Sequence, residues 1–140
     1  MKNSKFVVFL MFLVITATAN AQFMQAGLSE RLYNKLKQSG RNDNIRIMIV
    51  MKDQVDIAAL DRQLYQINAS AEYRAKTVIT SLMSKASSTQ GPILGFLAES
   101  SANGNVVSYK PFWITNFIWA EVKPDMVYSI AGRQDVAEMD

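Results

Sequence analysis

The side chains that could do chemistry in this chain are mainly carboxylates, because the 140-residue sequence contains no histidine and no cysteine. These two absences exclude a Ser-His-Asp or Cys-His catalytic site within the sequence, together with the common zinc sites. The densest carboxylate group is Asp53, Asp56 and Asp61. A calcium loop would also need a glycine and a terminal glutamate, which are missing, so we interpret this group as a solvated helix start. We therefore expect no catalytic residue, no metal and no cofactor in this chain.

The first 21 residues have the pattern of a secretory signal peptide. A positive start, an apolar run and a small-x-small cleavage site follow one another: Lys2 and Lys5, residues 6–15, and Ala19 and Ala21 before Gln22. A membrane anchor is the alternative, but the apolar run is too short to span a bilayer, which takes about 20 residues. We expect an exported protein, secreted or periplasmic, with no stable membrane anchor after signal removal.

The charge distribution and the absence of cysteine limit which partners and which stabilising bonds the exported chain can have. The formal net charge of +3 comes from 15 basic and 12 acidic side chains, and two of the basic ones are in the leader. The remaining 13 lysines and arginines are scattered along the sequence rather than gathered in a stripe, so we set nucleic acid aside as a partner. Since no disulfide is possible, the fold has to be held by its apolar core.

Hydrophobic periodicity predicts an α+β domain over residues 45–140, preceded by a helical lead-in over residues 22–44. In the lead-in, Ser29 is a suitable N-cap and Gly40 a stop. The expected strands are residues 45–51, 106–114, 117–122 and 136–139. The expected helices are residues 56–65, 71–86, a segment restarting at Pro92 after a break near Gly91, and a short helix from Pro124 to the stop at Gly132.

Two strands place apolar residues on both of their faces. In residues 45–51 the isoleucines form a core face, and nearly complete apolarity suggests a central strand covered on both sides; Met48 and Val50 fit either core or a partner surface. In residues 117–122, Phe117 and Trp119 lie opposite the smaller apolar residues. If helices cover only one sheet face, these two aromatic residues are exposed and we expect them to bind a partner. The alternative is that the additional helical segment covers them.

The end of the sequence, residues 116–140, resembles the second half of the propeptide of subtilisin-like serine proteases. The likeness is carried by Asn116-Phe-Ile-Trp-Ala-Glu-Val122, by the short helix with Met126, Val127 and Ile130, and by Gln134-Asp-Val-Ala-Glu-Met-Asp140. The strand at residues 45–51, followed by Lys52-Asp53, is similar to the first strand of that family. The roughly 50 residues between the first two strands are longer than in short propeptides and resemble a longer-propeptide branch. A coiled coil is an alternative for this segment, but its apolar stripe lasts only two or three heptads.

The resemblance implies a ferredoxin-like antiparallel sheet with helices on one face, an enlarged helical segment between the first and second strands, and no catalysis by this chain. It implies an intramolecular chaperone and inhibitor whose open face packs on the protease domain. Glu138 and Asp140 match the acids that cap helix N-termini of the protease. This sequence reaches Asp140, about where the inhibitory tail of that family begins. Most of that tail is therefore missing from it, and inhibition is expected to be weak. A free-standing inhibitor and an exported adaptor or structural module are the alternatives.

The cleavage pattern generates the first testable prediction. The exported protein should begin at Gln22, because Ala19 and Ala21 occupy the small positions that signal peptidase requires. N-terminal sequencing of material exported by a host cell measures this directly. Recovery of exported protein with Met1 intact would contradict it.

Overall fold

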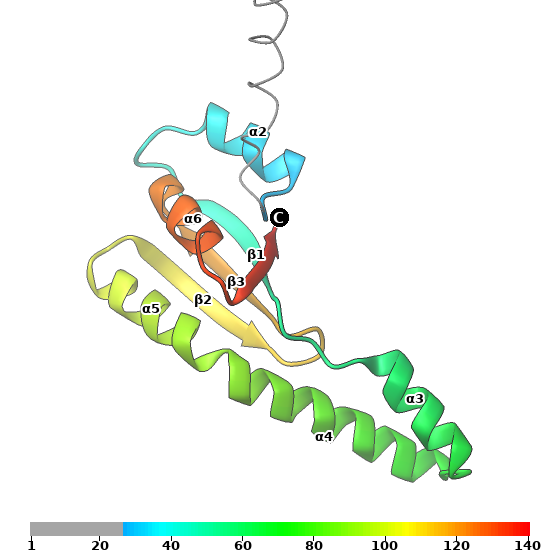
Figure 1. Ribbon diagram of the computed structural model, residues 1–140. Coiled ribbons are helices and arrows are strands. Elements are labelled where there is room, and N and C mark those ends of the chain that lie inside the picture. The colour runs from blue at the N-terminus through cyan, green and yellow to red at the C-terminus, as the bar shows by residue number, and fades with distance from the viewer. Residues whose placement is uncertain (1–26) are drawn as a thin grey trace, which may run out of the picture.

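The computed structural model describes residues 27–140; the expected signal peptide and its cleavage residues Ala19, Ala21 and Gln22 lie outside them. The described chain is α+β (Figure 1). Its elements, in order, are α2 (Glu30–Gln38), β1 (Ile45–Met51), α3 (Ile57–Gln66), α4 (Ala71–Thr89), α5 (Gly91–Ala102), β2 (Val106–Phe112), β3 (Phe117–Val122), α6 (Pro124–Ala131) and β4 (Val136–Met139).

The four strands form one antiparallel sheet in the order β2-β3-β1-β4. With the α3–α5 segment between β1 and β2, and α6 between β3 and β4, the chain has the βαββαβ order of a ferredoxin-like fold. Helices α5 and α6 lie on the same side of the sheet (Figure 1). The α+β, ferredoxin-like prediction is therefore confirmed, including the enlarged helical segment between the first two strands.

The core lies between the sheet and these helices. The alternation of β1 puts Ile45, Ile47, Ile49 and Met51 on the buried side, and the smaller residues of β3 lie next to them. Ile93 and Leu97 of α5, Val127 and Ile130 of α6, and Leu28, Leu32 and Leu36 around α2 complete the same cluster. The lead-in is thus part of the domain, because three of its leucines are buried with the sheet.

Helix α2 begins where its sequence predicts, because the hydroxyl of Ser29 accepts a hydrogen bond from the Leu32 amide at 3.1 Å. Asp56 caps α3 in the same way, accepting from the Ala59 amide at 2.8 Å. Pro124 opens α6 from its first turn, and Gly132 follows its last residue. Side-chain caps therefore set the starts of α2 and α3, and a proline sets the start of α6.

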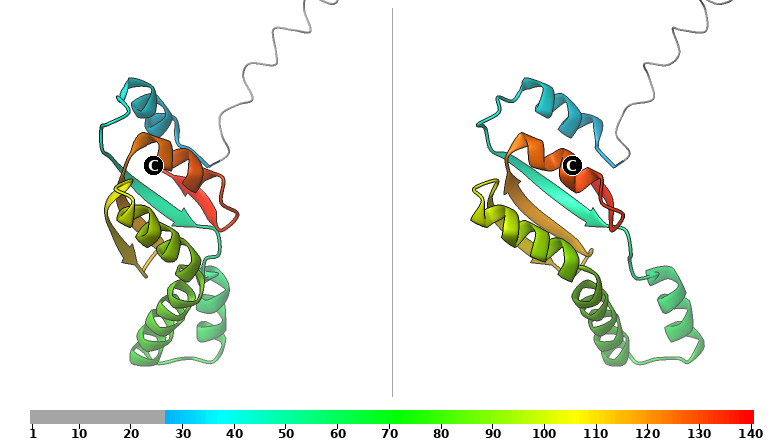
Figure 2. Two further views of the ribbon diagram at one scale, coloured as in Figure 1. Left: turned by 90° about the vertical axis from the view of Figure 1, so that its left-hand side faces the viewer. Right: turned by 60° about the vertical axis from the view of Figure 1, so that its left-hand side comes forward.

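Helices α3 and α4 form a hairpin that projects away from the sheet (Figures 1 and 2). Asp61 pairs with Arg74 across the hairpin at 2.5 Å. Helix α4 runs to Thr89, three residues beyond the predicted end, and breaks before α5 at the expected position near Gly91. Because the hairpin points away from the sheet, it leaves the sheet face that is not packed by α5 and α6 uncovered.

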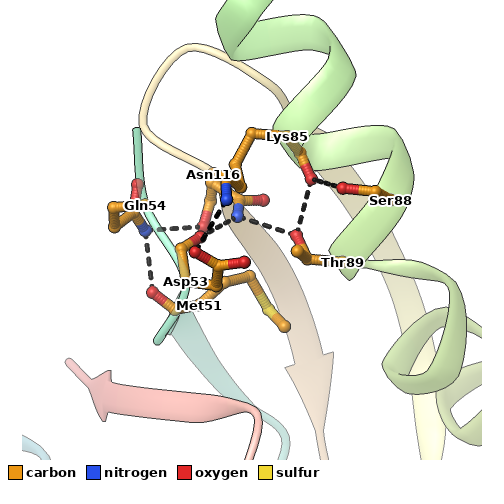
Figure 3. Close-up of polar contacts among 7 residues, drawn as sticks. All are labelled: Met51, Asp53, Gln54, Lys85, Ser88, Thr89 and Asn116. Carbon is orange, nitrogen blue, oxygen red and sulfur yellow. Dashed lines mark hydrogen bonds and ion pairs between the residues drawn. The ribbon is translucent and has the colours of Figure 1, made fainter. Parts of the chain in front are cut away.

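A buried amide joins the base of this hairpin to the sheet (Figure 3). Asn116, in the turn between β2 and β3, is 1% exposed and has a left-handed φ of +41°. Its side-chain amide donates to the Asp53 carbonyl at 2.7 Å and to the Thr89 hydroxyl at 2.9 Å, and its oxygen accepts from Gln90 at 2.9 Å. Its backbone carbonyl accepts from the Met51 amide at 3.0 Å. One side chain therefore holds the end of β1, the α4–α5 junction and the β2–β3 turn together.

Two predictions about the strands need correction. Residues 45–51 form a central strand, but the face bearing Met48 and Val50 is not covered by any described element, so the expectation of cover on both sides is wrong. The second strand ends at Phe112 rather than at residue 114, because residues 113–116 are used by the turn that brings Asn116 into the core.

Replacement of Asn116 by alanine is expected to lower the free energy of unfolding by about 2–4 kcal/mol, because buried hydrogen-bonding groups lose their partner. Asn116→Gly should cost about 1 kcal/mol less than Asn116→Ala, since glycine adopts the positive φ without a Cβ penalty. Urea unfolding followed by circular dichroism gives both values. Equal stability of wild type and Asn116→Ala would show that the amide is not structurally important.

Candidate functional site

The candidate site is the uncovered face of the sheet, formed by alternate residues of four strands. In β3, Phe117, Trp119 and Glu121 alternate with fully buried residues and are half-buried themselves. In β1, Met48 is 38% exposed between two buried isoleucines. The face is apolar in its two central strands, and large apolar side chains left open to water are typical of interaction surfaces.

Strand register arranges these side chains in rows across the sheet. One row consists of Lys110, Trp119, Met48 and Asp140 on successive strands, where Met48 and Asp140 exchange both of their backbone hydrogen bonds. The next row consists of Phe112, Phe117, Val50 and Glu138. In this row the rings of Phe112 and Phe117 stack at 4.6 Å between centroids, with an interplanar angle of 5°.

The charged groups of the face balance one another. Arg46 of β1 pairs with Glu121 of β3, with 3.4 Å between Nε and Oε2. The Lys110 ammonium lies 5.1 Å from the centroid of the Phe112 ring. The exposed Glu138 has no hydrogen bond or ion pair with any residue from 27 to 140. Apart from Asp140, two cations and two carboxylates thus surround the apolar centre, and among residues 27–140 Arg46 and Glu121 are the pair of these four that contact each other.

The Asp140 side chain is held by the start of α2. Its Oδ1 accepts from the Ser29 hydroxyl at 2.5 Å and from Arg31 Nε at 3.1 Å, and its Oδ2 accepts from Arg31 Nη2. The Arg31 guanidinium, followed by the Ser29 hydroxyl, holds the pKa of this carboxyl below its usual range. Asp140 therefore binds the first turn of a helix of its own chain through the N-cap side chain and the Arg31 guanidinium.

All five residues predicted to bind a partner lie on or at the rim of this single face: Met48, Phe117, Trp119, Glu138 and Asp140. Sequence reasoning did not assign Phe112 and Lys110 to the face. The signal for Phe112 is that it flanks the same four-residue turn as Phe117, so the two must be paired in a hairpin. The contacts of Ser29 and Arg31 with Asp140 had no sequence signal, because both residues lie more than 100 residues from Asp140.

The acidic group considered for calcium has other roles. Asp53 pairs with Lys85 at 2.8 Å, Asp56 caps α3, and Asp61 pairs with Arg74. Within residues 27–140, no three side chains of the metal-binding types come together in a way that could hold an ion. Among the helices of the described part, none has the length and apolarity needed to cross a membrane.

Comparison with known proteins found no family model, no curated protein and no solved structure that matches this chain. The resemblance to subtilase propeptides therefore stays a prediction. Support for a function has to come from the geometry of the uncovered face.

The Asp140 contacts predict a pH-dependent contribution to stability. Because the pKa of the folded carboxyl lies below the ordinary value of 3.8, the contribution is present above pH 3.8 and is lost as the pH falls through the lowered value. Asp140→Asn should therefore be less stable than wild type at neutral pH, by a modest amount because the ion pair is largely exposed, and the difference should shrink in acid.

Glu138→Gln is the matched control for this experiment, since Glu138 makes no contact of this kind within the described residues. Denaturant unfolding of the three proteins at neutral and at acidic pH measures the effect. If Asp140→Asn and Glu138→Gln both have the same free energy of unfolding as the wild type at neutral pH, the carboxylate of Asp140 does not hold α2 in place.

Proposed function

We propose that this domain is the propeptide of an exported subtilisin-like serine protease, acting on the protease domain as intramolecular chaperone and inhibitor. The observation that carries the proposal is the uncovered face, with Trp119 and Phe117 in the central strand β3 and Met48 next to them. The family resembled by the sequence uses this face of a ferredoxin-like sheet to dock on its protease. Because the chain contains no histidine and no cysteine, it does not supply a Ser-His-Asp or Cys-His catalytic site, and the proposal assigns proteolysis to the protease domain.

The face suits a protein partner because its centre is apolar and aromatic. Trp119 has Lys110 on one side and Met48 on the other, so a partner that covers it also removes the stems of its neighbours from water. Aromatic side chains in such central positions usually dominate the binding energy of an interface. Docking also provides a physical basis for the chaperone role, since a preformed sheet offers a folding surface to the partner.

The charges of the face favour a protein over a nucleic acid. Arg46 and Lys110 are balanced by Glu121 and Glu138, so the face has no net positive charge to attract phosphates. An open four-stranded sheet with aromatic residues is also a surface on which single-stranded RNA can stack, but that use needs cationic surroundings. Balanced charge around an apolar centre is the pattern expected where protein surfaces meet.

The two acids of the last strand differ in what they can offer to a partner. Asp140 is engaged by Ser29 and Arg31 of its own chain, whereas Glu138 is exposed next to Val50 and has no partner within residues 27–140. A helix N-terminus of the protease would therefore be met most directly by Glu138. Asp140 could cap the partner only after giving up its contacts with α2.

A free-standing inhibitor and an exported adaptor remain the alternatives, and both would use the same face. The inhibitor, like the propeptide, would bind a protease with this face, whereas the adaptor would bind another protein. Inhibition of a protease therefore separates the propeptide and the inhibitor from the adaptor. Acceleration of refolding of a denatured protease domain separates the propeptide from a simple inhibitor.

Trp119→Ala is expected to weaken binding to a subtilisin-like catalytic domain from the same genome by about 2 kcal/mol, or roughly 30-fold, through lost apolar contact. Inhibition of peptide hydrolysis in trans gives the affinity, and circular dichroism tests whether the variant is folded. Glu138→Gln should cost less, and its effect should shrink with added salt while that of Trp119→Ala should not.

Tyr65→Ala is the control, because Tyr65 is 74% exposed on the projecting hairpin and lies outside the face. It should inhibit like the wild type. Full-strength inhibition by a folded Trp119→Ala variant would rule out docking through this face, and absence of inhibition by the wild type would favour the adaptor. Unfolding of Trp119→Ala would show that Trp119 is part of the core.

A further inference from the structure

We propose that the uncovered sheet face also binds the same face of a second copy of this chain, giving a reversible two-fold dimer in which two four-stranded sheets pack face to face. The inference goes beyond the proposed protease partner and does not depend on it. It rests on the positions of the charged and apolar side chains on the four strands.

Charges of opposite sign lie at opposite edges of the face. Lys110 is on the edge strand β2, and Glu138 is on the edge strand β4 at the far side of the sheet. Between them, Arg46 is on β1 and Glu121 on β3, directly opposite each other. The cations and carboxylates therefore alternate across the sheet in the order of the strands.

A two-fold axis parallel to the strands brings these charges together. Such an axis reverses the strand order of the second sheet, so β2 of one copy lies over β4 of the other, and β3 lies over β1. Lys110 then faces Asp140, which is in the same row, and lies one row from Glu138, so it meets an acidic edge. Arg46 of each copy faces Glu121 of the other, which brings the two intramolecular pairs together as one group of four alternating charges.

The same axis matches the apolar residues. Trp119 and Met48 occupy one row on β3 and β1, so Trp119 of each copy covers Met48 of the other. Phe117 and Val50 occupy the next row and are matched in the same way. Sheets packed face to face lie about 10 Å apart with their strands nearly aligned, which suits side chains of this size.

An axis perpendicular to the strands is disfavoured by the same charges. It would place β2 over β2 and β4 over β4, and so bring the edge with Lys110 over the same edge of the other copy, and the edge with Glu138 and Asp140 over its own counterpart. Like charges facing each other across an interface are repulsive. The charge pattern thus selects one of the two simple ways in which the faces can meet.

The area of the face sets the strength of the dimer. Four strands about 4.8 Å apart, each contributing about six residues at about 3.4 Å, give a face of roughly 400 Å². This is about half of the roughly 800 Å² per partner that is typical of a stable complex. We therefore expect weak, reversible self-association, which a larger partner using the same face would displace.

The test is sedimentation equilibrium of the full chain, expressed with its own leader and purified as the host releases it, over a wide range of micromolar concentrations. Wild type should show a monomer–dimer equilibrium. Arg46→Glu and Glu121→Arg should each weaken the dimer about tenfold, because each places like charges opposite each other across the interface. The double variant Arg46→Glu/Glu121→Arg should return to within about twofold of the wild type, since the pairs are restored with their signs exchanged.

Lys76→Glu is the matched control, because it makes the same charge change at an exposed position on the projecting helix α4. It should leave the dimer unchanged, while Trp119→Ala should abolish it. Circular dichroism confirms that each variant is folded, and if Arg46→Glu does not fold, Glu121→Arg carries the charge test alone.

A wild type that is monomeric at every concentration overturns the proposal, as does a dimer that survives Trp119→Ala. Failure of the double variant to recover overturns the parallel axis. None of these results bears on the protease. Conversely, a Trp119→Ala variant that loses the dimer but still inhibits a protease would support this inference and rule out docking of the protease through this face.

Discussion

The arrangement of this domain depends on one buried side chain, the amide of Asn116. It is almost completely excluded from water, and its donors and acceptor are satisfied by Asp53, Thr89 and Gln90. These three residues come from the chain after β1 and from the α4–α5 junction, so the amide fixes where the helical segment leaves and re-enters the sheet. A buried amide that loses one of its partners is costly, so this geometry has little freedom to change.

The direction of the α3–α4 hairpin follows from that constraint and explains why one sheet face is left open. Helix α5 packs on the buried side of the sheet, and α4 is held at its junction with α5 by Thr89 and Gln90. From this point the hairpin extends beyond the end of the sheet, where its own apolar residues such as Ile79 and Met83 are about half exposed. An insertion long enough to cover Trp119 is thereby kept away from it.

Patterns within a single element could be predicted from the sequence, and arrangements between elements could not. The alternation of residues 45–51 and 117–122 identified both strands and the correct faces, because period-two alternation is a local signal. Residues 71–86 form the expected helix, but its apolar side chains differ in burial: Val78 and Leu82 are half-buried and Ala86 is buried, whereas Ile79 and Met83 are exposed. Which of them are buried depends on the direction of the hairpin, and Asn116, more than 25 residues away, fixes that direction.

The edges of the sheet explain why recognition through the face is more plausible than addition of a strand. The outer edge of β4 is occupied by residues 27–29, where Gly27 accepts from Met139 at 2.5 Å and Ser29 donates to it at 2.9 Å. Gly27 has a φ of +100°, and a Cβ there would lie 3.3 Å from the Ala137 carbonyl, so the close approach requires glycine. The edge of β2 carries Pro111, which has no amide hydrogen to offer, beside the charged Lys110. With one edge filled and the other unsuited to pairing, a partner of this sheet has to be recognised by side chains, and the large apolar ones in its central strands are on the uncovered face.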